Sequence, residues 1–192
     1  FKKNKISKKS NVLNLFDGED ELFKTLIKES KIYAEYGCGE STIYALSTKV
    51  EKVISVDNSS EWADQILKRS LNTNKLIIET IQMGELHKWS YPQSFDHNKN
   101  FKDYFLSIWK HEYKPDLVLI DGRFRVACFL TTILESSLGT KIIFDDYVDR
   151  KTYHIVEEVI KPTKVSGRQA LFVKDDNLEI DKVKKLLEKF EF

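Results

Sequence analysis

Acidic residues and glycines gather at the ends of the predicted strands of this sequence. Five short apolar runs predict strands that are buried on both faces: KIYAEY, KVISVD, KLIIETI, PDLVLID and TKIIFDD. In open α/β sheets, ligands bind beyond the carboxyl ends of the strands. The residues at or after those ends are Glu35, Gly37, Gly39 and Ser41; Asp57 and Asn58; Gln82, Met83, Gly84 and Glu85; Asp121, Gly122 and Arg123; and Asp145 and Asp146.

The glycine turn within KIYAEYGCGESTIYAL suits a nucleotide-like cofactor. Gly37 and Gly39 lack a Cβ atom, so their backbone can turn sharply and approach a ligand closely. Asp57, eighteen residues after Gly39, ends the second predicted strand, where a carboxylate can accept hydrogen bonds from ribose hydroxyls. A dinucleotide fingerprint would have glycine where Thr42 stands, and no Walker G-K-[ST] follows. The turn therefore favours a ribose-bearing cofactor other than NAD, and a nicotinamide or nucleotide-sugar enzyme stays an alternative.

The elements that position these residues alternate between strands and helices. Helical segments are predicted at Ser41–Thr48, Ser60–Ser70, Lys99–Glu112, Arg125–Ser136 and Arg150–Ile160. This alternation predicts an α/β fold: a Rossmann-like, doubly wound, mostly parallel sheet of about seven strands with helices on both faces. The segment TKVSGRQALFVKD adds a C-terminal antiparallel hairpin. We expect a single domain over residues 1–192, in which residues 1–10 form a flexible basic tail.

The charge of the chain is nearly balanced, with 31 Lys and Arg against 30 Asp and Glu among 192 residues. No net field attracts nucleic acid or an anionic membrane, and no apolar run approaches the roughly 20 residues of a membrane span. Cys38 and Cys128 stand alone without metal-type spacing, which favours reduced thiols and a cytoplasmic location. We therefore expect a small-molecule partner, no nucleic acid and no membrane, and a homo-oligomer is compatible with the sequence.

The pattern EYGCGES from Glu35 to Ser41, followed by VISVD ending in Asp57, resembles a known family. It is similar to motif I and its successor in class I S-adenosylmethionine-dependent methyltransferases, with Ser41 where a third glycine is common. The resemblance covers most of the chain and implies S-adenosylmethionine as the cofactor. The binding site that it implies has Glu35, Gly37 and Gly39 around the methionine part, Asp57 at the ribose, Met83 and Gly84 near the adenine, and Ser41, Asn58 and Asp121 beside them.

The ends of the fourth and fifth predicted strands, LVLIDGRF and IIFDDY, resemble metal-dependent O-methyltransferases of the catechol and macrocin types. In those enzymes carboxylates at these strand ends bind magnesium, so the resemblance implies Mg²⁺ at Asp121, Asp145 and Asp146. Such an ion prefers oxygen ligands and lowers the pKa of a coordinated hydroxyl. The catechol type has Asn at the second of the paired positions, and the macrocin type matches DDY better. In one alternative, Arg123 and Arg125 neutralise the carboxylates or bind an acidic acceptor; in another, the aspartate pair caps the next helix.

Together these features predict an S-adenosylmethionine-dependent methyltransferase that acts on an oxygen of a small molecule, such as a sugar or glycan precursor. Methyl transfer needs a nucleophile that is deprotonated and aligned with the sulfonium methyl group. The residues assigned to catalysis are Asp121, Asp145 and Arg123. A cofactor-binding module without catalysis is an alternative of a different class.

Overall fold

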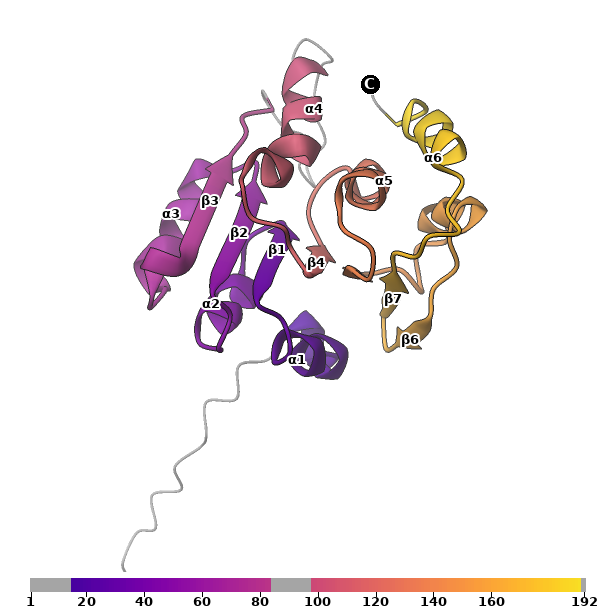
Figure 1. Ribbon diagram of the computed structural model, residues 1–192. Coiled ribbons are helices and arrows are strands. Elements are labelled where there is room, and N and C mark those ends of the chain that lie inside the picture. Colours follow the sequence, from indigo (N-terminus) through magenta and orange to yellow (C-terminus); the bar gives the residue numbers. More distant parts are fainter. Residues whose placement is uncertain (1–14, 84–97, 191–192) are drawn as a thin grey trace, which may run out of the picture.

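The computed structural model of the protein describes residues 15–83 and 98–190, which are built around a seven-stranded sheet (Figure 1). The strand order is β3-β2-β1-β4-β5-β7-β6. The first five strands run parallel, and β7 pairs antiparallel with β5 and β6. This confirms the predicted mostly parallel sheet with a C-terminal hairpin. The strands are β1 (Ile32–Tyr36), β2 (Lys52–Asp57), β3 (Leu76–Thr80), β4 (Leu117–Ile120), β5 (Lys141–Phe144), β6 (Lys164–Ser166) and β7 (Gln169–Val173).

Helices connect the strands and cover both faces of the sheet (Figure 1). Four predicted helical segments correspond to α2, α3, α4 with the η4 turn, and α5. No helix in the described part of the chain is long and apolar enough to cross a membrane. The α-helices are α1 (Glu21–Ile27), α2 (Glu40–Leu46), α3 (Ser60–Arg69), α4 (Asn98–Leu106), α5 (Arg125–Glu135) and α6 (Ile180–Leu187), and the 3-10 helices are η1 (Phe16–Gly18), η2 (Thr73–Lys75), η4 (Ser107–Lys110) and η5 (Lys151–Glu158).

Alternating side chains along the strands build a core on each face of the sheet. Ala34 and Tyr36 of β1 belong to a core that also contains residues of α4, α5 and α6, whereas Tyr33 belongs to a second core with residues of α1 and α2. Because both faces are covered, the strands are almost continuously apolar. Glu35 is an exception: its carboxylate is fully buried in β1, directly before the glycine turn.

Where the sequence predicts a helical segment over Arg150–Ile160, the structure forms the 3-10 helix η5. Tyr153, Val156 and Val159 are spaced by three residues, and all three pack against the core that contains α5. A 3-10 helix has three residues per turn and therefore brings such positions into line.

The winding of the sheet reverses between β1 and β4. From β1 the chain proceeds to β2 and β3, then crosses to β4 and β5 on the other side. The two loops that leave the sheet here lie close together, and the backbone N–H of Asp121 donates to the carbonyl of Tyr36 at 3.1 Å. A Cβ atom on Gly122 would lie 2.7 Å from the carbonyl carbon of Tyr36, so this approach requires glycine. Such a switch point is where α/β proteins bind their ligands.

Candidate active site

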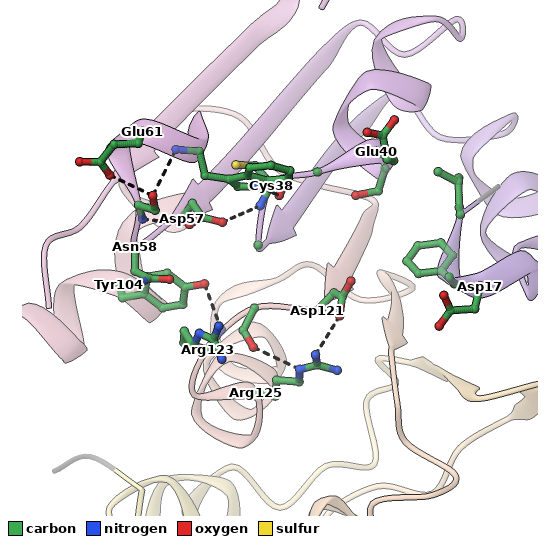
Figure 2. A pocket seen from close by; sticks show the side chains of 18 of the residues that line it. Asp17, Cys38, Glu40, Asp57, Asn58, Glu61, Tyr104, Asp121, Arg123 and Arg125 are labelled. Carbon is green, nitrogen blue, oxygen red and sulfur yellow. Dashed lines mark hydrogen bonds and ion pairs between the residues drawn. The ribbon is translucent and has the colours of Figure 1, made fainter. Parts of the chain in front are cut away.

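A cleft of about 790 Å³ opens at the switch point (Figure 2). This volume lies within the usual range of small-molecule and cofactor sites. Its walls come from the loops after β1, β2 and β4, from the start of α3, and from the segment around η1. Seven residues that the sequence predicted for the site line this cleft: Gly37, Gly39, Ser41, Asp57, Asn58, Asp121 and Arg123.

The two glycines of the loop after β1 have different structural requirements. Gly37 has a φ of +91°, and a Cβ atom there would lie 3.0 Å from the Cα atom of Gly122. The fold therefore needs glycine at this position. Gly39 has an extended φ of −178°, and a Cβ atom there would meet none of the described atoms within 4 Å. The fold itself thus accepts a side chain at Gly39, which lies on the cleft wall.

Glu35 lies behind this loop and not on the cleft wall. Its carboxylate accepts hydrogen bonds from Tyr33 Oη at 2.8 Å, from Ser41 Oγ at 2.6 Å and from Thr42 Oγ1. The Thr42 hydroxyl in turn accepts a hydrogen bond from the backbone N–H of Gly39 at 2.9 Å. Burial raises the pKa of Glu35, although the three hydroxyls oppose the shift. The sequence resemblance implies that Glu35 contacts the methionine part of a cofactor. In the structure, Glu35 instead connects β1 to the first turn of α2 through these hydrogen bonds.

One end of the cleft is formed by the end of β2 and the start of α3. The Asp57 carboxylate accepts hydrogen bonds from the backbone N–H groups of Cys38 at 3.1 Å and Ser59 at 2.9 Å, which fix its orientation. Trp62 Nε1 donates to the carbonyl of Cys38 at 2.7 Å, and 39% of Trp62 is exposed. Figure 2 shows Asn58 beside Asp57 at this end. A fixed carboxylate next to an exposed aromatic ring can hold a nucleoside by its hydroxyls and its base.

The residues predicted near the adenine are placed differently from that expectation. Met83 is 2% exposed and belongs to the apolar core that contains Phe101, outside the cleft wall. Gln82 lines the cleft instead, and its carbonyl accepts a hydrogen bond from Asn100 Nδ2 at 2.6 Å. Gly84 lies outside the described residues.

Asp121 and Arg123 in the loop after β4, together with Arg125 at the start of α5, line another part of the cleft. Asp121 Oδ1 lies 2.9 Å from Arg125 Nη2, and Figure 2 shows this pair between the ends marked by Asp57 and Asp17. Dense packing around the carboxyl group and the nearby charge of Asp145 raise the pKa of Asp121 to about 8, although Arg125 opposes the shift. A carboxyl group with a pKa near neutrality suits proton transfer. The backbone N–H of Arg123 donates to Tyr104 Oη at 3.2 Å.

The paired aspartates after β5 lie outside the cleft wall. Asp145 is 0% exposed, and Arg168 donates from both Nε, at 3.0 Å, and Nη2 to its two carboxylate oxygens. Asp146 Oδ2 lies 2.8 Å from Arg150 Nη2. The next helix, η5, has no side-chain cap, so the capping alternative is wrong. Asp145 therefore forms a buried ion pair with Arg168, and its assignment to catalysis stays a prediction.

The three aspartates meet, but guanidinium groups already lie among them. Carboxylate oxygens of Asp121, Asp145 and Asp146 lie within 4.8 Å of one another, as a metal site would require. Arg125 lies 2.9 Å from Asp121, 3.2 Å from Asp146 and 4.0 Å from the Asp145 carboxylate. A magnesium ion does not fit this cluster as it stands, because Arg125 would have to leave a buried, hydrogen-bonded position.

The N-terminal segment forms the end of the cleft opposite Asp57 (Figure 2). Phe16, Asp17 and Gly18 have φ values of +47°, +57° and +92°, and the first two line the cleft. Arg168 Nη1 donates to Asp17 at 2.8 Å, and the backbone N–H of Arg168 donates to the Glu19 carboxylate. The hairpin turn between β6 and β7 thus holds this segment. Left-handed conformations of residues other than glycine are costly and concentrate at binding sites.

Sequence reasoning missed several residues of the cleft wall. Trp62 is one of them, although its place five residues after Asp57 could have indicated the first turn of a helix beside the ribose site. Arg168 and Phe16 lie far from the other site residues in the chain, and no local pattern marks them. Their positions follow from the way the hairpin and the N-terminal segment fold back onto the strand ends.

Comparison with known proteins assigns the family. No family model matches the sequence, and no curated protein matches it either. Among solved structures, the chain is similar to a methyltransferase-like protein from Silicibacter pomeroyi, with 31% identity and a TM-score of 0.76 over 90% of this chain and 93% of that chain. The chain belongs to the class I S-adenosylmethionine-dependent methyltransferases.

Two more distant structures show the same fold. One is an O-methyltransferase from Bacillus cereus in complex with S-adenosylhomocysteine, with 16% identity and a TM-score of 0.50 over 90% of this chain and 67% of that chain. The other is the N-methyltransferase NodS from Bradyrhizobium japonicum, also in complex with S-adenosylhomocysteine, with 10% identity and a TM-score of 0.52 over 86% and 90%. Their names state that one methylates oxygen and the other nitrogen, so the fold alone does not specify the atom that accepts the methyl group.

Proposed function

We propose that the cleft binds S-adenosylmethionine and that the protein transfers its methyl group to an oxygen of a small molecule. The cofactor proposal is based mainly on Gly39. Neither its backbone conformation nor any described atom near it requires glycine at this position. A glycine on a cleft wall that the fold does not need is explained by a ligand that approaches the backbone closely. Asp57, held by two backbone N–H groups nearby, supports the same ligand.

Each part of the cofactor has candidate partners in the cleft. The loop from Gly37 to Ser41 would hold the methionine part, Asp57 the ribose hydroxyls, and Trp62 the adenine ring. Among the described residues of the wall, five carboxylates exceed three guanidiniums, which favours a cofactor with a positively charged sulfur. The carboxylates belong to Asp17, Glu40, Asp57, Glu61 and Asp121, and the guanidiniums to Arg123, Arg125 and Arg168.

The chain's own residues would orient the acceptor and accept its proton. Bound S-adenosylmethionine supplies a methyl group on a cationic sulfur, which makes that group open to attack by a lone pair. Asp121 is our candidate for the general base, because it lines the cleft and its pKa of about 8 lies near neutrality. Arg123, on the same wall, is a candidate for orienting the acceptor oxygen. No step is assigned to a metal ion.

The far end of the cleft supports a polyhydroxylated acceptor, such as a sugar or glycan precursor. Phe16 offers an aromatic ring there, and the Asp17 side chain is 91% exposed. An aromatic face can pack against the apolar face of a sugar ring, and a carboxylate accepts hydrogen bonds from hydroxyl groups. This arrangement favours oxygen over nitrogen as the methylated atom.

Ligand-induced stabilisation tests the cofactor proposal. S-adenosylhomocysteine should raise the melting temperature of the protein in a saturable way, because a ligand that binds the folded state stabilises it. NAD at the same concentration should leave the melting temperature unchanged. Stabilisation by NAD without stabilisation by S-adenosylhomocysteine would show that the cleft serves a nicotinamide enzyme.

The two glycines of the loop give a matched pair of variants. Gly39→Ala should unfold like the wild type but bind S-adenosylhomocysteine at least about tenfold more weakly, a loss of about 1.4 kcal/mol. Gly37→Ala should instead be destabilised without any ligand, because its positive φ and its contact with Gly122 require glycine. Unchanged affinity in Gly39→Ala would remove close approach of the cofactor as the reason for this glycine.

A further inference from the structure

Arg125 occupies the centre of the aspartate cluster and is held there by every nitrogen of its guanidinium group. Nε donates to the carbonyl of Gly122 at 3.1 Å, and Nη1 donates to the carbonyl of Asp145 at 2.7 Å. Nη1 also lies 3.2 Å from Asp146 Oδ2, and Nη2 lies 2.9 Å from Asp121 Oδ1. The side chain is 11% exposed. One planar cation thus joins the strand ends of β4 and β5.

The cluster has no excess of negative charge. The carboxylates of Asp145 and Asp146 have further guanidinium partners, Arg168 and Arg150, so three carboxylates face three guanidiniums. A divalent ion would add two positive charges at a site with no net negative charge. It could enter only if Arg125 left its four oxygen partners, and removing a buried partner from such a network is strongly unfavourable.

We propose that Arg125 stands where the metal-dependent O-methyltransferases that the sequence resembles would hold a cation, and that it is the positioning residue of Asp121. It fixes the Asp121 carboxylate on the cleft wall by joining it to the end of β5, a role that a bound ion would otherwise serve. The protein therefore binds no divalent cation at this cluster, and methyl transfer proceeds without one. This inference adds to the proposed function and does not depend on which acceptor is used.

Binding of Mn²⁺, measured by the loss of the free-ion electron paramagnetic resonance signal, tests the proposal. The wild-type protein should bind no Mn²⁺ up to about 1 mM, the weak end of the range of protein sites for such hard cations. Arg125→Ala exposes three carboxylates to one another, so it should bind Mn²⁺ at least about tenfold more tightly than this limit, and Mn²⁺ should raise its melting temperature. The double variant Arg125→Ala with Asp121→Asn should lose the gained binding.

Arg69→Ala is the matched control. It removes the guanidinium partner of another cleft carboxylate, Glu40, away from the aspartate cluster, and should gain no Mn²⁺ binding. If Arg125→Ala does not fold, Arg125→Gln removes the same charge while keeping a donor for the backbone carbonyls. Wild-type binding of Mn²⁺ that Asp121→Asn abolishes would overturn the proposal, and so would a folded Arg125 variant that gains no binding.

The metal titration is independent of the cofactor experiment. If S-adenosylhomocysteine fails to bind while Arg125→Ala gains Mn²⁺ binding, the proposed function fails and the role of Arg125 stands. The opposite pattern, cofactor binding together with a wild-type metal site, would leave the methyltransferase proposal in place and remove this inference.

Discussion

The hydroxyl of Thr42 connects the buried carboxylate of Glu35 to the backbone of the glycine loop, and its removal is a sharp test of how the loop is held. Thr42 is 0% exposed, donates to Glu35 and accepts from the N–H of Gly39 at 2.9 Å. Thr42→Val keeps the branched shape of the side chain and places a methyl group between these two partners. Both hydrogen bonds are then lost without a cavity.

The magnitude follows from the two partners of Thr42. A hydrogen bond to a charged group contributes about 1.5 to 3 kcal/mol, and a neutral one about 0.5 to 1.5 kcal/mol. Thr42→Val should therefore lower the free energy of unfolding by about 2 to 4.5 kcal/mol. For a chain of this size the melting temperature should fall by about 5 to 15 °C. Because the loop is less well fixed, S-adenosylhomocysteine should also bind more weakly.

Urea unfolding of Thr42→Val and of a matched control measures the effect. Thr131 is 1% exposed, and its hydroxyl has no hydrogen-bond partner among the residues that the structure describes. Thr131→Val should therefore leave the free energy of unfolding unchanged or raise it by up to about 1 kcal/mol. If Thr42→Val loses no more stability than Thr131→Val, the network around Glu35 does not hold the loop, and this reasoning is refuted.

Three further outcomes are expected. Gly122→Ala should lower the free energy of unfolding, measured by urea unfolding, by about 1 to 3 kcal/mol, because the new Cβ atom would lie 2.7 Å from the Tyr36 carbonyl carbon. A loss below about 0.5 kcal/mol would contradict this expectation. Calorimetry should show that affinity for S-adenosylmethionine, relative to S-adenosylhomocysteine, rises with pH through about 8 as Asp121 ionises and attracts the sulfonium, and a parallel rise in Asp121→Asn would exclude this cause. The pKa of Glu35 is raised in the folded state, so its contribution to stability is present below pH 4.5 and is lost as the pH rises through the folded pKa. Glu35→Gln should therefore reduce the fall in the free energy of unfolding above pH 4.5. An unaltered pH profile would show that other groups cause the fall.

The sheet and the glycine loop could be predicted because their signals are local. Apolar runs that end in acidic or glycine-containing turns indicate buried parallel strands, and β1 to β5 are found where those runs lie. The positions of Gly37, Gly39 and Asp57 on the cleft wall then follow from the rule that strand carboxyl ends share one edge.

The roles of individual charged residues depend on partners that are distant in sequence. Glu35 points away from the cleft because three hydroxyl groups, two of them on α2, donate hydrogen bonds to its carboxylate. Asp145 is closed off because Arg168, 23 residues later, returns to it across the antiparallel hairpin. The sequence offered Arg123 and Arg125 as alternative partners of the aspartates, and the structure places Arg125 in that role. Such pairings depend on side-chain positions that periodicity does not specify.

A crystal structure of the protein grown with S-adenosylhomocysteine would show whether the cleft binds the methyl donor. We expect density for the ligand in the cleft at the switch point, with the ribose hydroxyls at Asp57 and the amino-acid part along the loop that contains Gly39. Density at another site, or an empty cleft at saturating ligand concentration, would contradict the claim that this cleft is the methyl-donor site.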